Sequence, residues 1–425
     1  MGAPDQKGKL KILFLVPSFP SISETFIINQ IVDLIDRGHE VSIFASAKAE
    51  VALHSKIIEY DLLKKTVFAE IPVNISQRIK NFLSILFSSD KTDRRRLLKT
   101  LNIFRYKADA VKLSSFYRVA WLQQLDDCFD IVHAHFGYMA SYYYRGRECG
   151  YFANAQLVVT FHGYDMMPSD KEVNRYRYKE LFENNTLITT NNEYSRSLLL
   201  KIKEDYNNIR LLAVGLDTEY YTPIKIIKSD KAKNILFCGR LIELKGPKRV
   251  VEIANILINI RGNVHLNFWL IGDGDEEHIS GLTNLIETYG LEEKVKLLGP
   301  MLQDDVIRLM NKADVFILPG ITDVKGRAEN QGLVIQEAQA MGLPVIVTDA
   351  GGMKYGLIDK VTGFVIKEYD LPGFSNCIEE LISDTDLCDE MGIAGRKFVK
   401  DNYDIRILGD KLEDIYFDLK AGVVL

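Results

Sequence analysis

Paired cysteines, long apolar runs and an excess of positive charge are all missing from this sequence. The odd and scattered set of five cysteines contains no C-x-x-C pair: Cys128, Cys149, Cys238, Cys377 and Cys388. Such a set argues against a disulfide framework or a zinc ribbon and is typical of a reducing compartment. No apolar run approaches the ~18–20 residues of a spanning helix, and residues 1–11 lack the apolar stretch of a secretory signal. We therefore expect a cytoplasmic protein.

The net charge of −5 argues against nucleic acid as a bulk partner. That total conceals an asymmetry, because residues 78–118 hold 11 basic and 3 acidic residues, a local charge of +8 that leaves −13 on the rest of the chain. A basic block on an otherwise acidic protein indicates a local anionic partner.

The basic block also contains an amphipathic helical pattern. An apolar stripe at i, i+3, i+4, i+7 and i+8 is formed by Ile79, Phe82, Leu83, Leu86 and Phe87. Basic residues follow it at Lys91, at Arg94-Arg95-Arg96 and at Lys99. One interpretation is a core-packed helix with a solvated charged edge. The other is a peripheral surface that contacts an anionic membrane through residues 78–118.

Short apolar strand-like runs alternate with amphipathic helical segments along almost the whole chain. Strands are predicted at 11–16, 41–45, 130–135, 157–161, 187–190, 210–214, 234–239, 265–272, 294–299, 314–319 and 344–349. This pattern predicts parallel sheets with helices on both faces.

The pattern pauses in the polar, Pro- and Lys-containing stretch 222–233, and 425 residues favour two domains. We expect a Rossmann-like domain over 1–222, interrupted by a basic amphipathic insertion at about 76–118, and a second over 230–403. A C-terminal helix within 404–425 is expected to pack back near the first domain.

The stretch ENQGLVIQEA (329–338) has two acids, Glu329 and Glu337, on either side of Gly332-Leu333-Val334. It begins a predicted helix, so the N–H groups of Leu333 and Val334 are unpaired donors suited to phosphate. The two acids are too far apart to share a proton, but they can accept hydroxyl hydrogen bonds from two parts of one long polyol. These ten residues alone favour a simpler interpretation, with Glu329 as a loose cap and Glu337 as an exposed helix residue.

A second cluster changes the balance. GRLIELKG (239–246) follows the predicted strand 234–239 and places Arg240 and Lys245 in the loop at its carboxyl end. In open parallel sheets ligands bind at that edge. Two cations beside a helix N-terminus form a clamp for a pyrophosphate, although either cation alone is equally typical of a solvated loop.

These motifs resemble those of the retaining nucleotide-sugar glycosyltransferases of family 4, and in particular the bacterial colanic acid and exopolysaccharide type. The resemblance rests on GRLIELKG, the E-x7-E stretch and AMGLPVIVTDAGG (340–352). It extends to LIGDGDE (270–276), VGLDTEYY (214–221), TFHGYD (160–165) and VPSFPSISETFI (16–27). It covers nearly the whole chain except the basic block. It implies the GT-B fold, an α/β architecture of two Rossmann-like domains whose parallel sheets face each other across a cleft.

The resemblance implies roles for individual residues on the donor side. Arg240 and Lys245 would bind the donor diphosphate and stabilise the leaving group. Glu329 would hold hydroxyls of the donor sugar, and Glu337 those of the ribose. The remaining donor-binding positions are Gly272, Gly332, Leu333 and Val334.

Four further residues are assigned by the resemblance to the other side of the cleft. His162 would lie near the sugar and the reacting carbon, as a catalytic residue together with Arg240, Lys245 and Glu329. The acceptor side would contain His135, Ser23 and Glu24.

The chain departs from the family pattern at two places. Asn330-Gln331 follows the first acid where the family often has Gly-Phe, and we expect donor choice to depend on this pair. After Gly351-Gly352 the chain has Lys354-Tyr355-Gly356 where the family often has an acid, so no role for that acid carries over.

Several motifs imitate other chemistries. Asp273 and Asp275 in GDGDEE (272–277) resemble a metal-binding D-x-D. The same stretch also contains a G-x-G, but a dinucleotide fingerprint needs a third glycine at position 277, where this chain has a glutamate. We interpret this stretch as a strand-end loop that lines the base pocket. His133 and His135 share one face of a strand, and two histidines without a third ligand nearby are typical of packed or substrate-facing positions. We expect no cofactor and no metal.

The sequence therefore predicts a retaining, metal-independent hexosyltransferase. No carboxylate pair is placed like the acid and nucleophile of a retaining glycosidase, so the leaving phosphate would take the acceptor's proton. UDP-sugar is the favoured donor and GDP-mannose the alternative. The expected acceptor is a lipid-linked or polysaccharide precursor at the inner membrane face. Two other functions stay open: a UDP-sugar 2-epimerase-like isomerase, and a catalytically silent sugar-nucleotide-binding subunit.

Overall fold

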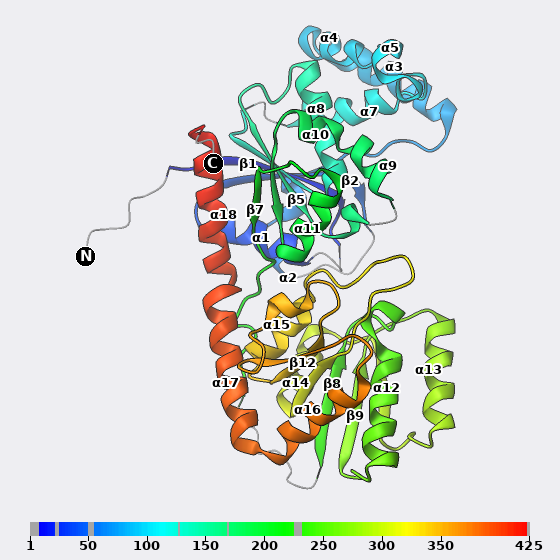
Figure 1. Cartoon of the computed structure of the whole chain (residues 1–425). Coiled ribbons are helices and arrows are strands. Elements are labelled where there is room, and N and C mark those ends of the chain that lie inside the picture. Colours follow the sequence, from blue (N-terminus) through cyan, green and yellow to red (C-terminus); the bar gives the residue numbers. More distant parts are fainter. Residues whose placement is uncertain are drawn as a thin grey trace, which may run out of the picture.

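Two parallel sheets form the framework of the computed structural model, which describes residues 8–21, 25–49, 55–125, 128–167, 170–224 and 232–422. The first sheet has the order β3-β2-β1-β4-β5-β6-β7 and the second has the order β10-β9-β8-β11-β12-β13. The strand pairings within both sheets are parallel. The two sheets and their helices lie one above the other in Figure 1.

The first sheet and its helices come from the N-terminal half. Its strands are β1 (Lys11–Phe19), β2 (Glu40–Lys48), β3 (Thr66–Phe68), β4 (Ile131–His135), β5 (Gln156–Phe161), β6 (Leu187–Thr190) and β7 (Ile209–Leu211). Its helices are α1 (Thr25–Asp36), α2 (Ser55–Glu59), α3 (Ile75–Ser88), α4 (Lys91–Lys99), α5 (Ile103–Tyr106), α6 (Ala108–Val111), α7 (Ser114–Ala120), α8 (Ala140–Cys149), α9 (Lys171–Arg177), α10 (Lys179–Glu183) and α11 (Glu193–Ile202).

The second sheet and its helices follow in sequence. Its strands are β8 (Lys233–Cys238), β9 (Leu266–Ile271), β10 (Val295–Gly299), β11 (Val315–Leu318), β12 (Val345–Thr348) and β13 (Gly363–Ile366). The helices are α12 (Pro247–Asn255), α13 (Glu276–Thr288), α14 (Gln303–Lys312), α15 (Leu333–Ala340), α16 (Leu371–Ser383), α17 (Thr385–Asn402) and α18 (Ile405–Lys420).

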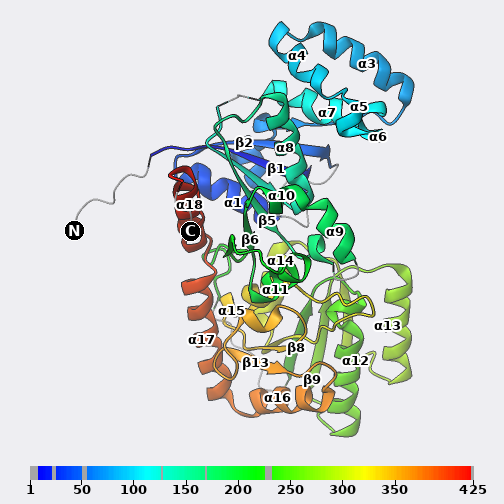
Figure 2. The same cartoon turned by 45° about the horizontal axis from the view of Figure 1, so that its top comes forward.

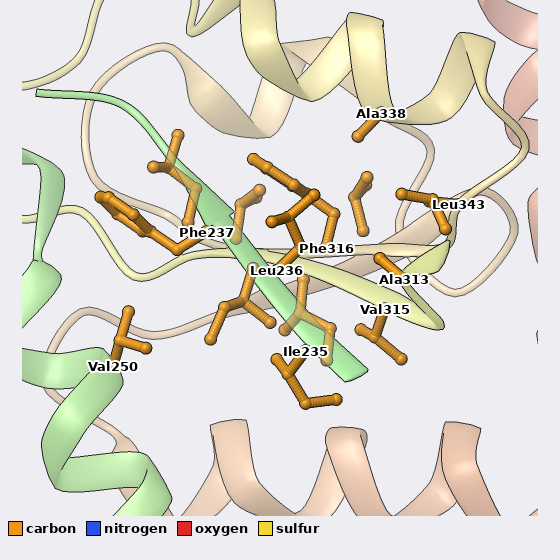
Figure 3. Packing of buried hydrophobic residues seen from close by; sticks show 14 of the residues in the cluster. Ile235, Leu236, Phe237, Val250, Ala313, Val315, Phe316, Ala338 and Leu343 are labelled. Atoms are coloured by element: carbon orange, nitrogen blue, oxygen red, sulfur yellow. The ribbon is translucent and has the colours of Figure 1, made fainter. Parts of the chain in front are cut away.

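The predicted parallel α/β architecture is confirmed, and its cause is visible in the burial of the strands. Central strands of a parallel sheet are covered on both faces and therefore consist of continuous apolar runs. Ile235, Leu236 and Phe237 of β8 are fully buried, as is Phe316 of the neighbouring β11, and Figure 3 shows these side chains together in the core of the second domain. The sequence analysis did not predict β3 or β13, which have three and four residues.

The chain crosses between the two sheets twice, and the crossings lie side by side. Residues near Leu216 lead from the first sheet to the second, and residues near Asp404 lead back. The Leu216 N–H donates to the Tyr403 carbonyl (3.0 Å) and the Ile405 N–H to the Leu216 carbonyl (2.9 Å). α17 and α18 then form a nearly continuous column along both domains, on the left in Figure 1.

α18 is attached to the first domain by polar contacts as well as by its apolar face. The Arg37 guanidinium donates to Asp410 (2.6 Å) and to the Arg406 carbonyl (2.6 Å). The Tyr416 hydroxyl lies 2.6 Å from Nδ1 of His133 on β4. The first domain is therefore completed by a segment nearly 300 residues away, since Tyr416 and His133 are 283 residues apart.

The basic block forms α3 to α7, a layer of helices at the end of the first domain remote from the second sheet (Figures 1 and 2). Phe82 and Leu86 of α3 pack against the core of the first domain, whereas Ile79, Leu83 and Phe87 are exposed. The predicted apolar stripe is thus divided between core and surface. Among the described residues, no helix is long and apolar enough to cross a membrane.

Candidate functional site

A cleft of about 540 Å³ lies between the two domains. On the side of the first domain it is lined by the loop after β5, including His162 and Tyr164, and by α11. On the other side it is lined by the loop after β8, including Arg240, and by the loop before α15, including Glu329. Both loops of the second domain follow the carboxyl ends of parallel strands, the edge at which such sheets bind ligands.

Lys245 and Glu329 form an ion pair between these two loops of the second domain. Each side chain is only 15% exposed. Burial by itself raises the pKa of Glu329, but the Lys245 ammonium and the N–H groups of Gly332 and Asn330 outweigh it, so the net pKa lies below its ordinary value. Glu329 is therefore an ionised acceptor at neutral pH, and not the loose cap of the simpler sequence interpretation.

Glu337 lies further along α15 in a different environment. Its carboxylate accepts a hydrogen bond from the Tyr221 hydroxyl (2.8 Å) and another from Gln303, and the Gln303 amide also donates to Tyr221 (2.8 Å). Burial raises the pKa of Glu337, and these hydrogen bonds together with Lys245 offset only part of that rise. Glu337 is half-buried, so the simpler interpretation of an exposed helix residue is wrong.

Lys245 interacts with both acids. It pairs directly with Glu329, and its charge also lowers the pKa of Glu337 and of Cys238. Burial and the Glu337 carboxylate nevertheless raise the pKa of the Cys238 thiol to about 12. Cys238 is thus a neutral thiol near Glu337 and Lys245 rather than a nucleophile.

The Glu329 loop is confined by a neighbouring loop. The Gly352 N–H donates to the Glu329 carbonyl (2.8 Å). A Cβ atom on Gly352 would overlap the Asn330 carbonyl oxygen, so only glycine permits this approach. Gly332, at φ 71°, then reverses the chain into α15, which begins at Leu333 and directs its first-turn N–H groups to the edge of the sheet.

Asn330 and Gln331, the departure from the family pattern, contact the first domain. The Ser195 hydroxyl donates to the Asn330 side chain, and the Asn192 amide donates to the Asn330 carbonyl (2.6 Å). Gln331 accepts from the Val214 N–H (2.9 Å) and donates to the Val214 carbonyl (2.8 Å). These four hydrogen bonds connect the residues beside Glu329 to α11 and to the interdomain crossing.

His162 is held in place by aromatic rings and by a second histidine. Its ring centroid lies 4.9 Å from each of Phe26 and Phe136, and its Nε2 lies 2.9 Å from Nδ1 of His135. Burial lowers the pKa of His162 to about 3, so the imidazole is neutral at physiological pH. His135 is 1% exposed and lies behind His162, away from the surface of the cleft.

The remaining predicted positions have varied placements. Gly272 packs against the backbone of Gly239 rather than lining the cleft. Ser23 and Glu24 lie outside the described residues. In GDGDEE (272–277), Asp275 caps α13 by accepting a hydrogen bond from the His278 N–H (2.9 Å), and Asp273 accepts one from the Gly274 N–H (2.9 Å). No group of three metal-ligating side chains occurs in the part of the chain that the structure describes.

The sequence assigned no role to several residues that complete the site. Tyr221 and Gln303 hold Glu337, and Asn192 and Ser195 hold the Glu329 loop. Tyr221 belongs to VGLDTEYY, one of the motifs that carry the family resemblance, but the resemblance gave this tyrosine no role. The other three had no signal, because contacts over 135 residues, as between Ser195 and Asn330, leave no periodic trace in the sequence.

Comparison with known proteins finds similarity to glycosyltransferases. Residues 222–398 match the sequence model of "Glycosyl transferases group 1". The chain is 29% identical over 363 residues to the amylovoran biosynthesis glycosyltransferase AmsK of Erwinia amylovora, covering 85% of this chain and 88% of the relative. It is also 27% identical over 308 residues to an Escherichia coli protein named UDP-Gal:alpha-D-GlcNAc-diphosphoundecaprenol alpha-1,3-galactosyltransferase, covering 68% of this chain and 76% of that one.

Solved structures show the same fold over nearly the whole chain. A glycosyltransferase from Rickettsia africae ESF-5 has a TM-score of 0.70 at 21% identity, covering 97% of this chain and 99% of its own. Anabaena Alr3699/HepE, solved in complex with UDP, has a TM-score of 0.69 at 17% identity, with coverages of 96% and 99%. The fold predicted from the sequence, two parallel-sheet α/β domains of the GT-B type, is confirmed.

The interdomain contact at Asn330 generates a prediction about stability. Ser195→Ala and Asn330→Ala should each lower the free energy of unfolding by about 1 kcal/mol, the usual loss for one hydrogen bond. The double variant should be no worse than the more damaging single variant, because both remove the same bond. Chemical denaturation of the three variants and the parent measures this coupling.

Asn267→Ala provides the matched control, since its amide donates to Asn234 (3.1 Å) within the second sheet. Combined with Ser195→Ala, its effect should simply add. Additive effects for the Ser195 and Asn330 pair would show that these residues do not interact across the domains.

Proposed function

We propose that the protein transfers a hexose from a nucleotide diphosphate sugar to an acceptor hydroxyl in polysaccharide biosynthesis. The proposal starts from the match of residues 222–398 to the group 1 glycosyl transferase model and from the similarity to the amylovoran biosynthesis glycosyltransferase. The observation that carries this proposal is the placement of Arg240, Glu329 and His162 around one interdomain cleft, with Lys245 paired to Glu329. These are cationic, anionic and neutral polar groups that suit a diphosphate and a sugar.

The donor diphosphate would bind Arg240 and Lys245. The Arg240 guanidinium is exposed in the cleft and pairs with no acid among the described residues. It can therefore donate two hydrogen bonds to a phosphate in bidentate geometry. Lys245 already pairs with Glu329. A diphosphate adds negative charge beside this ammonium, which leaves Glu329 able to turn towards sugar hydroxyls. The first-turn N–H groups of Leu333 and Val334 supply further donors for phosphate.

The proposed reaction proceeds with retention of configuration. The bond between the anomeric carbon and the phosphate oxygen breaks, the acceptor oxygen bonds to the same face of that carbon, and the acceptor's proton passes to the departing phosphate. Of the three acids that line the cleft, Asp323 is bonded to Arg327 (2.6 Å) and Glu329 is paired to Lys245, so neither is a free nucleophile, and Glu243 is exposed to water. Catalysis then rests on positioning and on charge stabilisation of the diphosphate.

A metal-independent reaction is part of the proposal. Arg240 and Lys245 supply the positive charge that a divalent cation otherwise supplies to a leaving diphosphate. The two aspartates of GDGDEE already accept backbone N–H groups.

UDP is the proposed nucleotide, and GDP-mannose is the alternative donor. The E. coli relative is named for UDP-Gal, and Anabaena Alr3699/HepE was solved with UDP. The loop after β9 and the start of α14 would surround the base. Gln303 at that start already bonds to Tyr221, which in turn holds Glu337, and Glu337 is the proposed acceptor for the ribose hydroxyls.

The proposed acceptor is a lipid-linked polysaccharide precursor at the inner membrane face. The name of the E. coli relative specifies a diphosphoundecaprenol acceptor. In this chain the helices α3 to α6 expose large apolar side chains, including Phe87 (72%) and Phe104 (91%). Exposed basic residues on the same helices include Lys80, Lys91, Arg95 and Lys99. Apolar side chains beside cations suit an anionic bilayer surface.

The two flanking arginines of the triple run have structural partners. Arg94 donates to the carbonyls of Leu86 (2.9 Å) and Phe87 (3.1 Å), which end α3. Arg96 donates to the Gly150 carbonyl (3.0 Å). Of the three, Arg95 alone is exposed, so the membrane proposal depends on Arg95 and the exposed lysines and not on the whole run.

The alternative functions receive less support. An isomerase needs acid and base groups near the sugar, whereas the neutral His162 and the paired Glu329 are poor proton donors. A silent binding subunit would not need a leaving-group clamp, and both Arg240 and Lys245 are present. Release of UDP and free sugar from UDP-glucose without acceptor distinguishes the transferase from both.

Glu329 and Lys245 are predicted to have different roles, in sugar recognition and in turnover respectively. Glu329→Ala should weaken discrimination among donor sugars, while UDP still binds. Lys245→Ala should lower kcat by about 10²–10³-fold and leave the order of sugar preference unchanged. Turnover of UDP- and GDP-sugars and calorimetric titration with UDP measure both effects.

Lys248→Ala is the matched control, because Lys248 is an exposed cation on the adjacent α12 and should affect neither quantity. If Glu329→Ala and Lys245→Ala weakened the binding of free UDP equally, the proposed division would be contradicted.

The exposed aromatic side chains of the insertion predict membrane binding. The parent protein should float with vesicles that contain phosphatidylglycerol at low salt, and high salt should release it. Phe87→Asp combined with Phe104→Asp should reduce the bound fraction at least about tenfold, because each buried Phe contributes about 1.5–3 kcal/mol.

Ile393→Asp on α17 is the control, since Ile393 is equally exposed at 72% but lies in the second domain. The Ile393→Asp variant should therefore float with the vesicles as the parent protein does. A parent protein that stays in the soluble fraction at low salt would refute the membrane proposal.

A further inference from the structure

A second, much smaller cavity lies behind His162. Its volume is about 20 Å³, enough for one water molecule. Its walls come from α1, β4, β5, the chain around the interdomain crossing and the first turns of α18. Three buried polar atoms of its lining residues have no hydrogen-bond partner among the described residues: Gln30 Oε1, His135 Nε2 and Asn191 Oδ1.

The protonation of His135 limits how these three atoms can be satisfied. His135 is 1% exposed, and burial together with the neighbouring histidines holds its pKa well below the ordinary value. The ring is therefore neutral and carries one proton, on Nδ1 or on Nε2. With the proton on Nδ1, three acceptors would face the cavity, and one water molecule has only two protons to donate. With the proton on Nε2, one donor and two acceptors face it, which one water molecule satisfies completely.

We propose that this cavity binds one ordered water molecule, which fixes His135 as the Nε2–H tautomer, and that His135 in turn fixes the tautomer of His162. The water would accept from His135 Nε2 and donate to Gln30 Oε1 and Asn191 Oδ1. Buried polar atoms without partners are costly, and this arrangement leaves none of the three unpaired.

The consequence for His162 follows from the hydrogen bond between the two rings. His135 Nδ1 lies 2.9 Å from His162 Nε2, and the two ring planes are only 7° apart. An imidazole N–H and lone pair lie in the ring plane, so near-parallel planes allow one ring to donate to the other. If the His135 proton is on Nε2, its Nδ1 must accept, and the proton of this bond belongs to His162 Nε2.

His162 Nδ1 is then unprotonated and acts as a hydrogen-bond acceptor. It has no partner among the described residues, and His162 lines the main cleft. On the proposed function, His162 would accept a hydrogen bond from a donor-sugar hydroxyl rather than donate one. His135, Gln30 and Asn191 are positioning residues, because they act on the sugar only through His162.

His133, the third histidine, does not take part in this chain. Its ring is stacked 4.4 Å from His135, but its nitrogens bond to the Tyr416 hydroxyl (2.6 Å) and to the Thr160 hydroxyl (2.7 Å). Either tautomer of His133 is satisfied by hydroxyl groups, which can donate or accept. The direction of the His135–His162 bond therefore depends on the small cavity.

The tautomers can be measured directly on the full chain without ligand. The protein has seven histidines, and two-bond proton–nitrogen correlation spectra of ring-¹⁵N-labelled protein distinguish protonated from unprotonated nitrogens. His135→Asn and His162→Gln variants assign the signals. The expected result is Nε2–H for both His135 and His162. A proton on His162 Nδ1, or exchange between both tautomers, overturns the inference.

Two variants test whether the cavity controls the tautomer and turnover. Gln30→Met removes one acceptor at similar length and should allow both His162 tautomers, lowering kcat about five- to tenfold with UDP affinity unchanged. Gln123→Met is the matched control and should change neither, because among the described residues Gln123 bonds only to Ser89 (2.9 Å) in the remote insertion. Unaltered His162 signals in Gln30→Met would also refute the proposal.

Replacement of His135 separates its hydrogen bond from its bulk. His135→Asn retains an acceptor for His162 and should keep most of the turnover, whereas His135→Leu should lose about tenfold. Equal activities of these two variants contradict a positioning role. The tautomers are measured without substrate, so failure of the proposed function would show as absent turnover with unchanged spectra, while failure of this inference shows in the spectra themselves.

Discussion

The ion pair of Lys245 and Glu329 holds together the two loops on which the site depends. Both charges are largely removed from water, which is costly for isolated ions, and each compensates the other at close range where the dielectric is low. The N–H groups of Gly332 and Asn330 add to this and keep Glu329 ionised. A ligand with its own negative charge is therefore needed to release Glu329 from Lys245, and a donor diphosphate has that charge. On the proposed function, the lysine that holds Glu329 would also bind the leaving group.

Around this pair the second domain supplies the charges and the first domain supplies a neutral wall. Glu329 is confined by Gly352 on one side, while Asn330 and Gln331 bond to the first domain on the other. His162 faces the cleft as a neutral ring supported by Phe26, Phe136 and His135. The conformation of Glu329 thus depends on contact between the domains. We expect the tilt of one domain against the other to influence donor binding for this reason.

Much of the fold and part of the site could be predicted from the sequence. Apolar runs separated by amphipathic helices predicted the parallel sheets, and the position of Arg240 and Lys245 after a strand predicted a charged loop at the ligand-binding edge. Other features could not be predicted, because they depend on contacts between distant residues. Tyr221 is 116 residues from Glu337, and nothing in its local pattern distinguishes it from a core tyrosine. The Arg94-Arg95-Arg96 run gave no sign that Arg94 bonds to the end of α3. Asn330-Gln331 suggested a role in donor choice, yet both side chains bond across the domain boundary.

The central claim is that this cleft binds a nucleotide diphosphate sugar through Lys245 and Arg240. The most direct test is the melting temperature of the protein with UDP, GDP, UDP-glucose and GDP-mannose, compared with that of Lys245→Met. A ligand at 100 times its Kd stabilises the native state by about 2.7 kcal/mol, which gives a clear rise in Tm. We predict a rise with UDP and UDP-glucose that is largely lost in Lys245→Met. If no nucleotide diphosphate or nucleotide sugar raised the Tm of the parent protein, the account would be contradicted.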